Sequence, residues 1–95
     1  MNKYEFTIIL KPNLDEEAQK AEMEKVNVLI ERFGGSIEKV DEWGKRRLAY
    51  EIDKCTEGIY HFITFKSDSN APGEIESRVR IMESVLRYLI IRVEE

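Results

Sequence analysis

The feature that most constrains the fold is a strand-helix-strand pattern that occurs twice within 95 residues. In the first unit, alternating apolar residues at 3–11 precede a helical periodicity at 15–33, and extended sequence then continues through Ile37 to Ile52. In the second unit, an apolar strand at 59–66 precedes a short amphipathic segment, and 85–93 is strand-like again. Few topologies allow a chain with this order to bury both helices against one sheet.

Capping and turn residues predict where the first unit begins and ends its elements. Asn13 and Asp15 are both suitable N-caps for the first helix, and acidic residues in its first turn suit the positive end of the helix dipole. Gly34 supplies the left-handed stop that commonly ends a helix. Gly44 is expected to bend or bulge the second strand, which carries the chain toward Ile52.

In the second unit, residues 53–58 are expected to form a polar, turn-rich connection before the third strand. Ser69 or Asn70 is the predicted cap of the second helix, with Pro72 in its first turn. The apolar stripe of that helix is expected to consist of Ile75, Val79 and Met82.

The element order βαββαβ predicts an α+β fold in a single domain covering residues 1–95. Two right-handed βαβ units place their helices on the same side of the sheet, and the strand pairs interleave in the antiparallel order 4-1-3-2. This is the ferredoxin-like split βαβ fold, a four-stranded antiparallel sheet with two helices on one face. The other face of the sheet is expected to be bare.

Strand alternation divides the apolar residues between these two faces. The residues expected to face the helices are Phe6, Ile8, Ile63, Phe65 and Ile90. The residues expected on the bare face are Ile9, Tyr60, Phe62, Leu89 and Ile91. Such an apolar and aromatic patch is typical of an interaction surface, unless the third strand alternates differently or the fold associates with itself.

A basic cluster, Lys45, Arg46 and Arg47, lies within the segment W-G-K-R-R-L-A-Y-E-I-D-K at 43–54. A strand with such a cluster often presents it to an anion or an acidic partner. Alternatively, these are solubilising charges on a sheet edge, where they discourage unwanted strand pairing. The chain carries a net charge of -4, with acidic residues concentrated in the first helix, so non-specific nucleic-acid binding is disfavoured but a local basic site is not.

Other functional classes find little support in the sequence. No apolar run is long enough for a membrane helix, and no secretory signal is apparent, so a cytoplasmic location is expected. Cys55 is the only cysteine, so neither an internal disulfide nor a cysteine-based metal site is expected. We expect no cofactor and no small-molecule substrate.

Enzymatic activity is not expected either. Small ferredoxin-like domains include acyl-phosphate hydrolases, which cradle phosphate in a glycine-rich loop. The corresponding loop here, at 11–14, contains no glycine, so its backbone does not readily wrap an anion. His61 is the only histidine, and no Ser or Cys beside it suggests a nucleophilic pair.

The RNA recognition motif shares this topology, but its third strand requires aromatic residues at fixed positions for base stacking. The third strand here matches that signature at Gly58 and misses its aromatic positions. We therefore interpret Tyr60 and Phe62 as residues that pack against protein rather than against bases.

Three segments together resemble bacterial small-subunit ribosomal protein six. They are K-Y-E-F-T-I-I-L-K-P-N-L at the N-terminus, F-G-G-S-I-E-K-V after the first helix, and the segment at 43–54 followed by G-I-Y. The resemblance extends from Tyr4 to Val93, and residues 44–54 are its most specific part. It implies an assembly protein, without enzymatic activity, that binds the central domain of small-subunit ribosomal RNA together with small-subunit ribosomal protein eighteen.

The resemblance also implies site residues. By position, the RNA contacts fall on Lys3, Tyr4, Arg87 and Arg92. The segment R-x-L-A-Y, similar to the region beside the protein partner, falls on 46–50, so Arg46, Arg47 and Ala49 join the bare-face residues Tyr60, Phe62, Leu89 and Ile91 as candidate partner contacts. The alternative function is a ligand-sensing ferredoxin-like dimer in which two bare faces pair.

Overall fold

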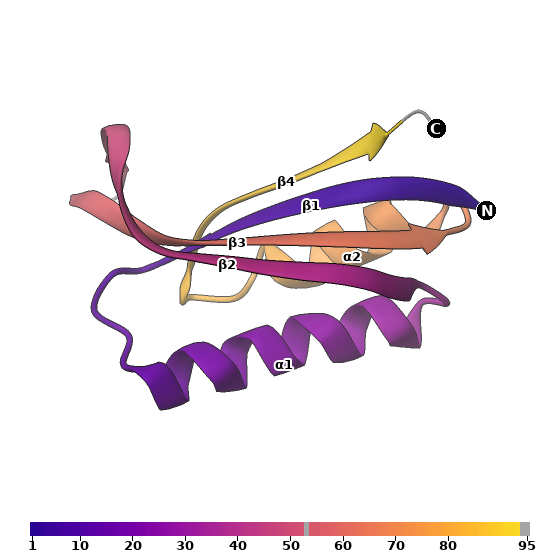
Figure 1. Cartoon of the computed structure of the whole chain (residues 1–95), viewed down its shortest axis with the longest axis horizontal. Helices are drawn as coiled ribbons and strands as arrows, with labels where there is room; N and C mark the ends of the chain where they lie inside the picture. Colours follow the sequence, from indigo (N-terminus) through magenta and orange to yellow (C-terminus); the bar gives the residue numbers. More distant parts are fainter. Residues whose placement is uncertain (53, 94–95) are drawn as a thin grey trace.

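The computed structural model describes residues 1–52 and 54–93. Its elements, in chain order, are β1 (Asn2–Leu10), α1 (Glu16–Arg32), β2 (Ser36–Ile52), β3 (Cys55–Ser67), α2 (Ala71–Val79) and β4 (Val85–Val93). The four strands form one antiparallel sheet in the order β2-β3-β1-β4. Figure 1 shows the helices packed against this sheet. The predicted ferredoxin-like fold and its strand order are confirmed.

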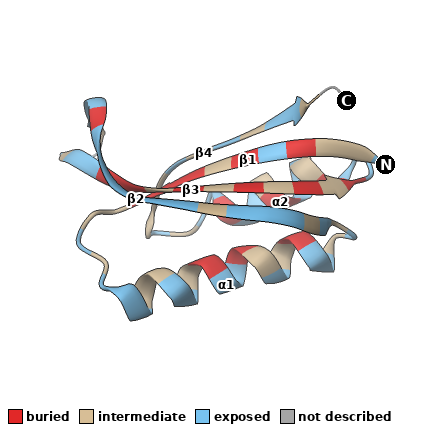
Figure 2. Cartoon of the chain, in the orientation of Figure 1, coloured by how far each residue is buried: buried red, intermediate tan, exposed pale blue. Residues whose placement is uncertain are grey.

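The core lies between the sheet and both helices. Phe6 and Ile8 of β1 and Phe65 of β3 are fully buried, and they pack with Val26 of α1 and Ile75 of α2. Figure 2 shows the buried residues of α1 on the side that faces the sheet. Both helices therefore cover one face, because the alternation of β1 and β3 sends their largest apolar side chains to that side.

The predicted ends of α1 are confirmed in detail. Asp15 is the N-cap, and its carboxylate accepts a hydrogen bond of 2.8 Å from the backbone N–H of Ala18. Gly34 follows the helix with φ of 85°, in the left-handed region that favours glycine. In β2, Gly44 has φ of 76° beside a shift in the pairing with β3, so the predicted bulge is present.

The second helix is shorter than its apolar stripe indicated. It ends at Val79. Met82 lies beyond it in a turn, where the backbone N–H of Met82 donates a hydrogen bond to the carbonyl of Val79. Ile75 and Val79 are buried within the helix, whereas Met82 packs on the edge of the core after the chain has turned toward β4. Asn70 is the N-cap residue, but its side chain makes no capping hydrogen bond.

The connection between β2 and β3 is also shorter than predicted. Cys55 to Gly58 belong to β3 rather than to a turn, and Lys54, with φ of 64°, is at the reversal. The two strands continue to pair beyond the main sheet, with Arg47 opposite Glu57 and Ile52 opposite Cys55, so the backbone groups expected in a loop bond each other instead. Residues 46–52 and 54–58 thus form a hairpin, here called the arm. Asp53 of the predicted turn and the terminal Glu94 and Glu95 lie outside the described residues.

Candidate functional site

The sheet face opposite the helices, here called the open face, is formed by alternate residues of β1, β3 and β4. Strand pairing places Thr7 opposite both Phe62 and Leu89, and Ile9 opposite both Tyr60 and Arg87. Side chains at paired positions project from the same side of a sheet, so the predicted division between the two faces is confirmed. Leu89 is 57% exposed and Ile91 is 48% exposed, so the surface of β4 here is apolar and uncovered.

An aromatic cluster extends the open face onto β2. The ring of Trp43 lies 4.7 Å from that of Phe62, edge to face, and the ring of Tyr60 lies 6.3 Å from that of Phe62. The guanidinium of Arg46 lies 5.7 Å from the centre of the Trp43 ring. Sequence reasoning missed Trp43 as a member of this face. The signal that could have identified it was the bulge at Gly44. This bulge leaves Trp43, between Glu42 and Gly44, without an opposite residue on β3.

The arm covers one end of the open face, which the sequence did not indicate. Figure 1 shows it bending away from the line of the sheet, on the side opposite α1. Leu48 of the arm is buried near Ile9, and Ile9 is only 7% exposed although no helix lies on its side of the sheet. The guanidinium of Arg87 lies 5.6 Å from the centre of the Tyr50 ring and donates a hydrogen bond to its hydroxyl.

The four residues expected to contact RNA do not lie together. Arg87 is on the open face, whereas Arg92 pairs with Tyr4 and projects from the helix side, about 17 Å further along the strand. The ring of Tyr4 belongs to the core, stacked 5.5 Å from Phe65. Lys3 forms an ion pair of 3.9 Å with Glu38. Lys3 pairs with Val93, so it shares the open face with Arg87 but lies near the opposite end of the sheet.

The residues expected to contact a protein partner are more closely grouped. Tyr60, Phe62, Leu89 and Ile91 share the open face, and Arg46 reaches it through Trp43. Leu48 points toward Ile9, so alternation along the arm sends Arg47 and Ala49 to its other side. The segment R-x-L-A-Y is therefore divided between the two sides of the arm.

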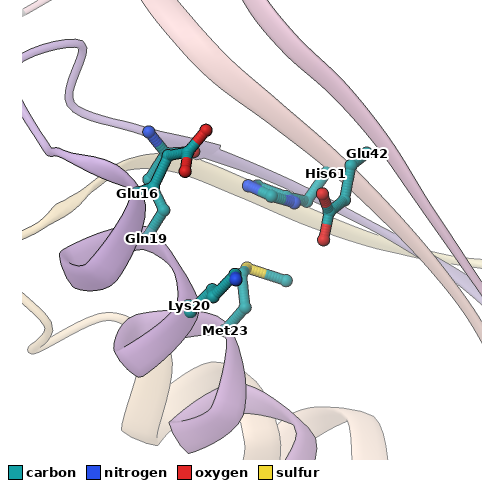
Figure 3. A pocket seen from close by; sticks show the side chains of 6 residues that line it. All are labelled: Glu16, Gln19, Lys20, Met23, Glu42 and His61. Carbon is teal, nitrogen blue, oxygen red and sulfur yellow. The ribbon is translucent and has the colours of Figure 1, made fainter.

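His61 lies on the helix side of β3, at a cavity of about 200 Å³ between the sheet and α1 (Figure 3). It is 3% exposed, and neither ring nitrogen has a hydrogen-bond partner among the described residues. The cavity is also lined by Glu16, Lys20 and Glu42. Burial lowers the pKa of His61 below its usual value of 6.5, and the nearby Glu42 carboxylate opposes that shift only in part.

This burial predicts a pH dependence of stability. Because the pKa of His61 is lower in the folded protein, the unfolded chain binds more protons as the pH falls below 6.5. The free energy of unfolding is therefore expected to be constant above that pH and to fall as the pH drops toward the lowered pKa. Urea unfolding of the wild type and of His61→Gln at several pH values between 7.5 and 5.5 measures the difference. Equal pH dependence in the two proteins would contradict the prediction.

Within 1–52 and 54–93, no group of three or more His, Cys, Asp or Glu side chains is arranged to hold a metal ion. Neither helix in the described part of the chain has the length and hydropathy required to span a bilayer.

Comparison with known proteins gives matches over the full length. Residues 3–92 match the family described as ribosomal protein S6. Among similar proteins, small ribosomal subunit protein bS6 of Clostridium acetobutylicum is 50% identical over 95 residues, covering all of both chains, and the same protein of Clostridium novyi is 47% identical with the same coverage. The crystal structure of 30S ribosomal protein S6 from Thermotoga maritima superposes with a TM-score of 0.92 at 35% identity, covering 97% of this chain and 87% of that one.

Proposed function

Because the chain belongs to the ribosomal protein S6 family, we propose that it is a structural component of the small ribosomal subunit, located in cytoplasmic ribosomes. In this proposal it binds the central domain of small-subunit ribosomal RNA together with small-subunit ribosomal protein eighteen. The observation that carries the proposal is the open face, where exposed Leu89, Ile91 and Trp43 surround partly buried aromatic rings. Proteins seldom leave such a surface uncovered unless it binds something.

The composition of the open face favours protein as its main occupant. Leu89, Ile91 and Phe62 offer no donors for phosphate oxygens, but aromatic and aliphatic side chains of this kind typically form the centre of a protein interface. The partner implied by the resemblance is small and basic, which complements an acidic chain with net charge -4. We infer that RNA is bound at the margin of this interface, by arginines rather than by stacked bases.

Among the arginines at the margin of the open face, Arg87 is the one that the geometry favours most as an RNA contact. Its guanidinium is held against Tyr50 of the arm, at one end of the apolar surface. A planar guanidinium fixed in this way is well suited to hold phosphate oxygens at two points.

Replacing Arg87 with alanine is expected to weaken RNA binding and to reduce the slope of log K against log salt by about one, because one phosphate contact is lost. The measurement is a filter-binding or anisotropy titration of a central-domain RNA fragment with the protein pair, at several salt concentrations. Arg87→Lys, which keeps the charge, should retain the slope. Arg80→Ala is the control, because Arg80 is an exposed arginine at the end of α2. An unchanged slope in Arg87→Ala would exclude that residue from the RNA site.

The proposed function is tested by sedimentation of a tagged protein through a sucrose gradient of cell lysate. Migration with the small ribosomal subunit that persists in moderate salt is the expected result. Confinement to the light fractions at low salt, with twice the mass of the chain, would contradict the proposal and favour the ligand-sensing dimer.

A further inference from the structure

A second apolar surface lies between α1 and the end of α2, on the side of the molecule away from the open face. It is a groove of about 710 Å³, and its apolar lining includes Val28 and Leu29 of α1 and Ile81 and Met82 beyond α2. Val28 is 55% exposed and Ile81 is 76% exposed. Neither contributes to the buried core, so the fold itself gives no reason for large apolar side chains there.

The spacing of residues along α1 makes this groove linear. Ala21, Val28 and Arg32 line it at intervals of seven and four residues, and this stripe is separate from the one that packs on the sheet, which contains Met23, Val26 and Ile30. From Ala21 to Arg32, the wall is about 16 Å long, which corresponds to about three turns of helix. A helix of two to three turns, with apolar residues at i, i+4 and i+7, matches this length.

The charges at the groove are opposite in sign to those of the chain as a whole. Arg32 and Arg78 line the groove, both are exposed, and among the described residues no ion pair involves either of them. Arg78 lies 5.9 Å from the centre of the Phe33 ring, so both arginines are near the C-terminal end of α1. Two other charged residues line the groove. Lys25 forms an ion pair of 3.3 Å with Glu22, and Glu24 is the acidic residue of the lining.

We propose that this groove binds an amphipathic helical segment of another protein, with acidic residues in its first turn. The apolar side chains of that segment would cover Val28 and Ile81, and its acidic turn would lie against Arg32 and Arg78. Acidic residues are favoured in the first turn of a helix, so the charge pattern that suits the arginines also suits the bound conformation. The apolar floor contributes nothing to a phosphate backbone, which favours a peptide over RNA.

The test uses two designed 14-residue helical peptides with leucine at i, i+4 and i+7. One carries glutamate in its first turn and along its flanks, and the other carries lysine at the same positions. Binding to the full chain is followed by fluorescence anisotropy, and its location by shifts of backbone amide signals in nuclear magnetic resonance spectra. The acidic peptide is expected to bind, to shift amides of residues 25–32 and 78–82, and to bind at least tenfold more tightly than the lysine peptide.

Two variants of the groove should weaken binding of the acidic peptide at least tenfold: Ile81→Glu, which removes the apolar anchor, and Arg32→Glu combined with Arg78→Glu. Ile81 is largely exposed, so its replacement should leave the melting curve unchanged. Leu89→Glu is the matched control, because Leu89 is an exposed apolar residue on the open face. This variant should bind the peptide as the wild type does.

Several results would overturn the proposal. These are equal binding of the two peptides, no binding of the acidic peptide, or amide shifts that fall on the open face. A protein mass that rises with concentration and returns to that of one chain in Ile81→Glu would show that a second copy occupies the groove. Loss of ribosomal RNA binding in the double arginine variant would identify RNA as the occupant.

Discussion

Replacing Leu89 with glutamate is expected to weaken binding of small-subunit ribosomal protein eighteen by at least 100-fold, about 2.8 kcal/mol, without altering the fold. Leu89 lies opposite Thr7 in the middle of the open face and is 57% exposed. In the free protein, water therefore hydrates a glutamate side chain at this position, and the substitution costs little folding free energy. In the proposed complex the carboxylate would be buried without a partner, and burial of an unpaired charge is strongly unfavourable.

Isothermal titration of the purified partner into the wild type and the variant measures the change. Ile81→Glu is the matched control, because it introduces the same charge at another exposed apolar position, away from the open face. Phe62→Glu is a less clean substitution, since Phe62 packs against Trp43 and Tyr60 and its loss disturbs the aromatic cluster. Unchanged affinity in Leu89→Glu, with reduced affinity in Ile81→Glu, would move the partner site from the sheet to the helices.

The second large effect is expected at Gly58, where the arm joins the sheet. A Cβ atom at this position would lie 2.4 Å from Cγ2 of Ile9 and 3.4 Å from Cδ2 of Leu48. Cγ2 is attached directly to Cβ of a buried isoleucine, so it can move aside only if the side chain changes its restricted χ1 angle or the strand shifts. We expect Gly58→Ala to lower the free energy of unfolding by about 1–3 kcal/mol, the usual cost of overpacking.

Gly73→Ala is the control for this prediction. Gly73 lies in α2, and a Cβ there would have no neighbouring atom within 4 Å. The same substitution should therefore stabilise the protein by up to about 1 kcal/mol, because alanine has the higher helix propensity. Urea unfolding of both variants measures the two effects, which are expected to have opposite signs. Equal stability of Gly58→Ala and the wild type would show that the arm does not pack on β1 in solution.

Much of the fold could be predicted because its determinants are local. The two-residue period of β1 and the helical period of α1 identify these elements and their buried sides without reference to distant residues. Asp15 and Gly34 determine the ends of α1 through their own side chain and backbone, and Gly44 marks the bulge in the same way. The end of α2 was predicted less well, because Met82 continues the apolar period although the chain has already turned toward β4.

The candidate site was predictable only in part. The sequence correctly assigned Tyr60, Phe62, Leu89 and Ile91 to one face, because alternation relates residues along each strand. Alternation along residues 3–11 puts Tyr4 on the same face as Phe6 and Ile8, and its ring is indeed in the core, although the resemblance implied that Tyr4 contacts RNA.

The sequence by itself determined the order of elements, the sheet topology and the two faces of the sheet, because each follows from local periodicity and the handedness of βαβ units. Only the tertiary structure decided how the arm bends, and hence that Leu48 covers Ile9 and that Tyr50 meets Arg87, 37 residues away. The physical reason is that strand twist and bulges accumulate along β2 and β3. The position of the end of the arm depends on the accumulated twist and bending of these strands. It also depends on packing between segments that are distant in the sequence, which no local sequence pattern predicts.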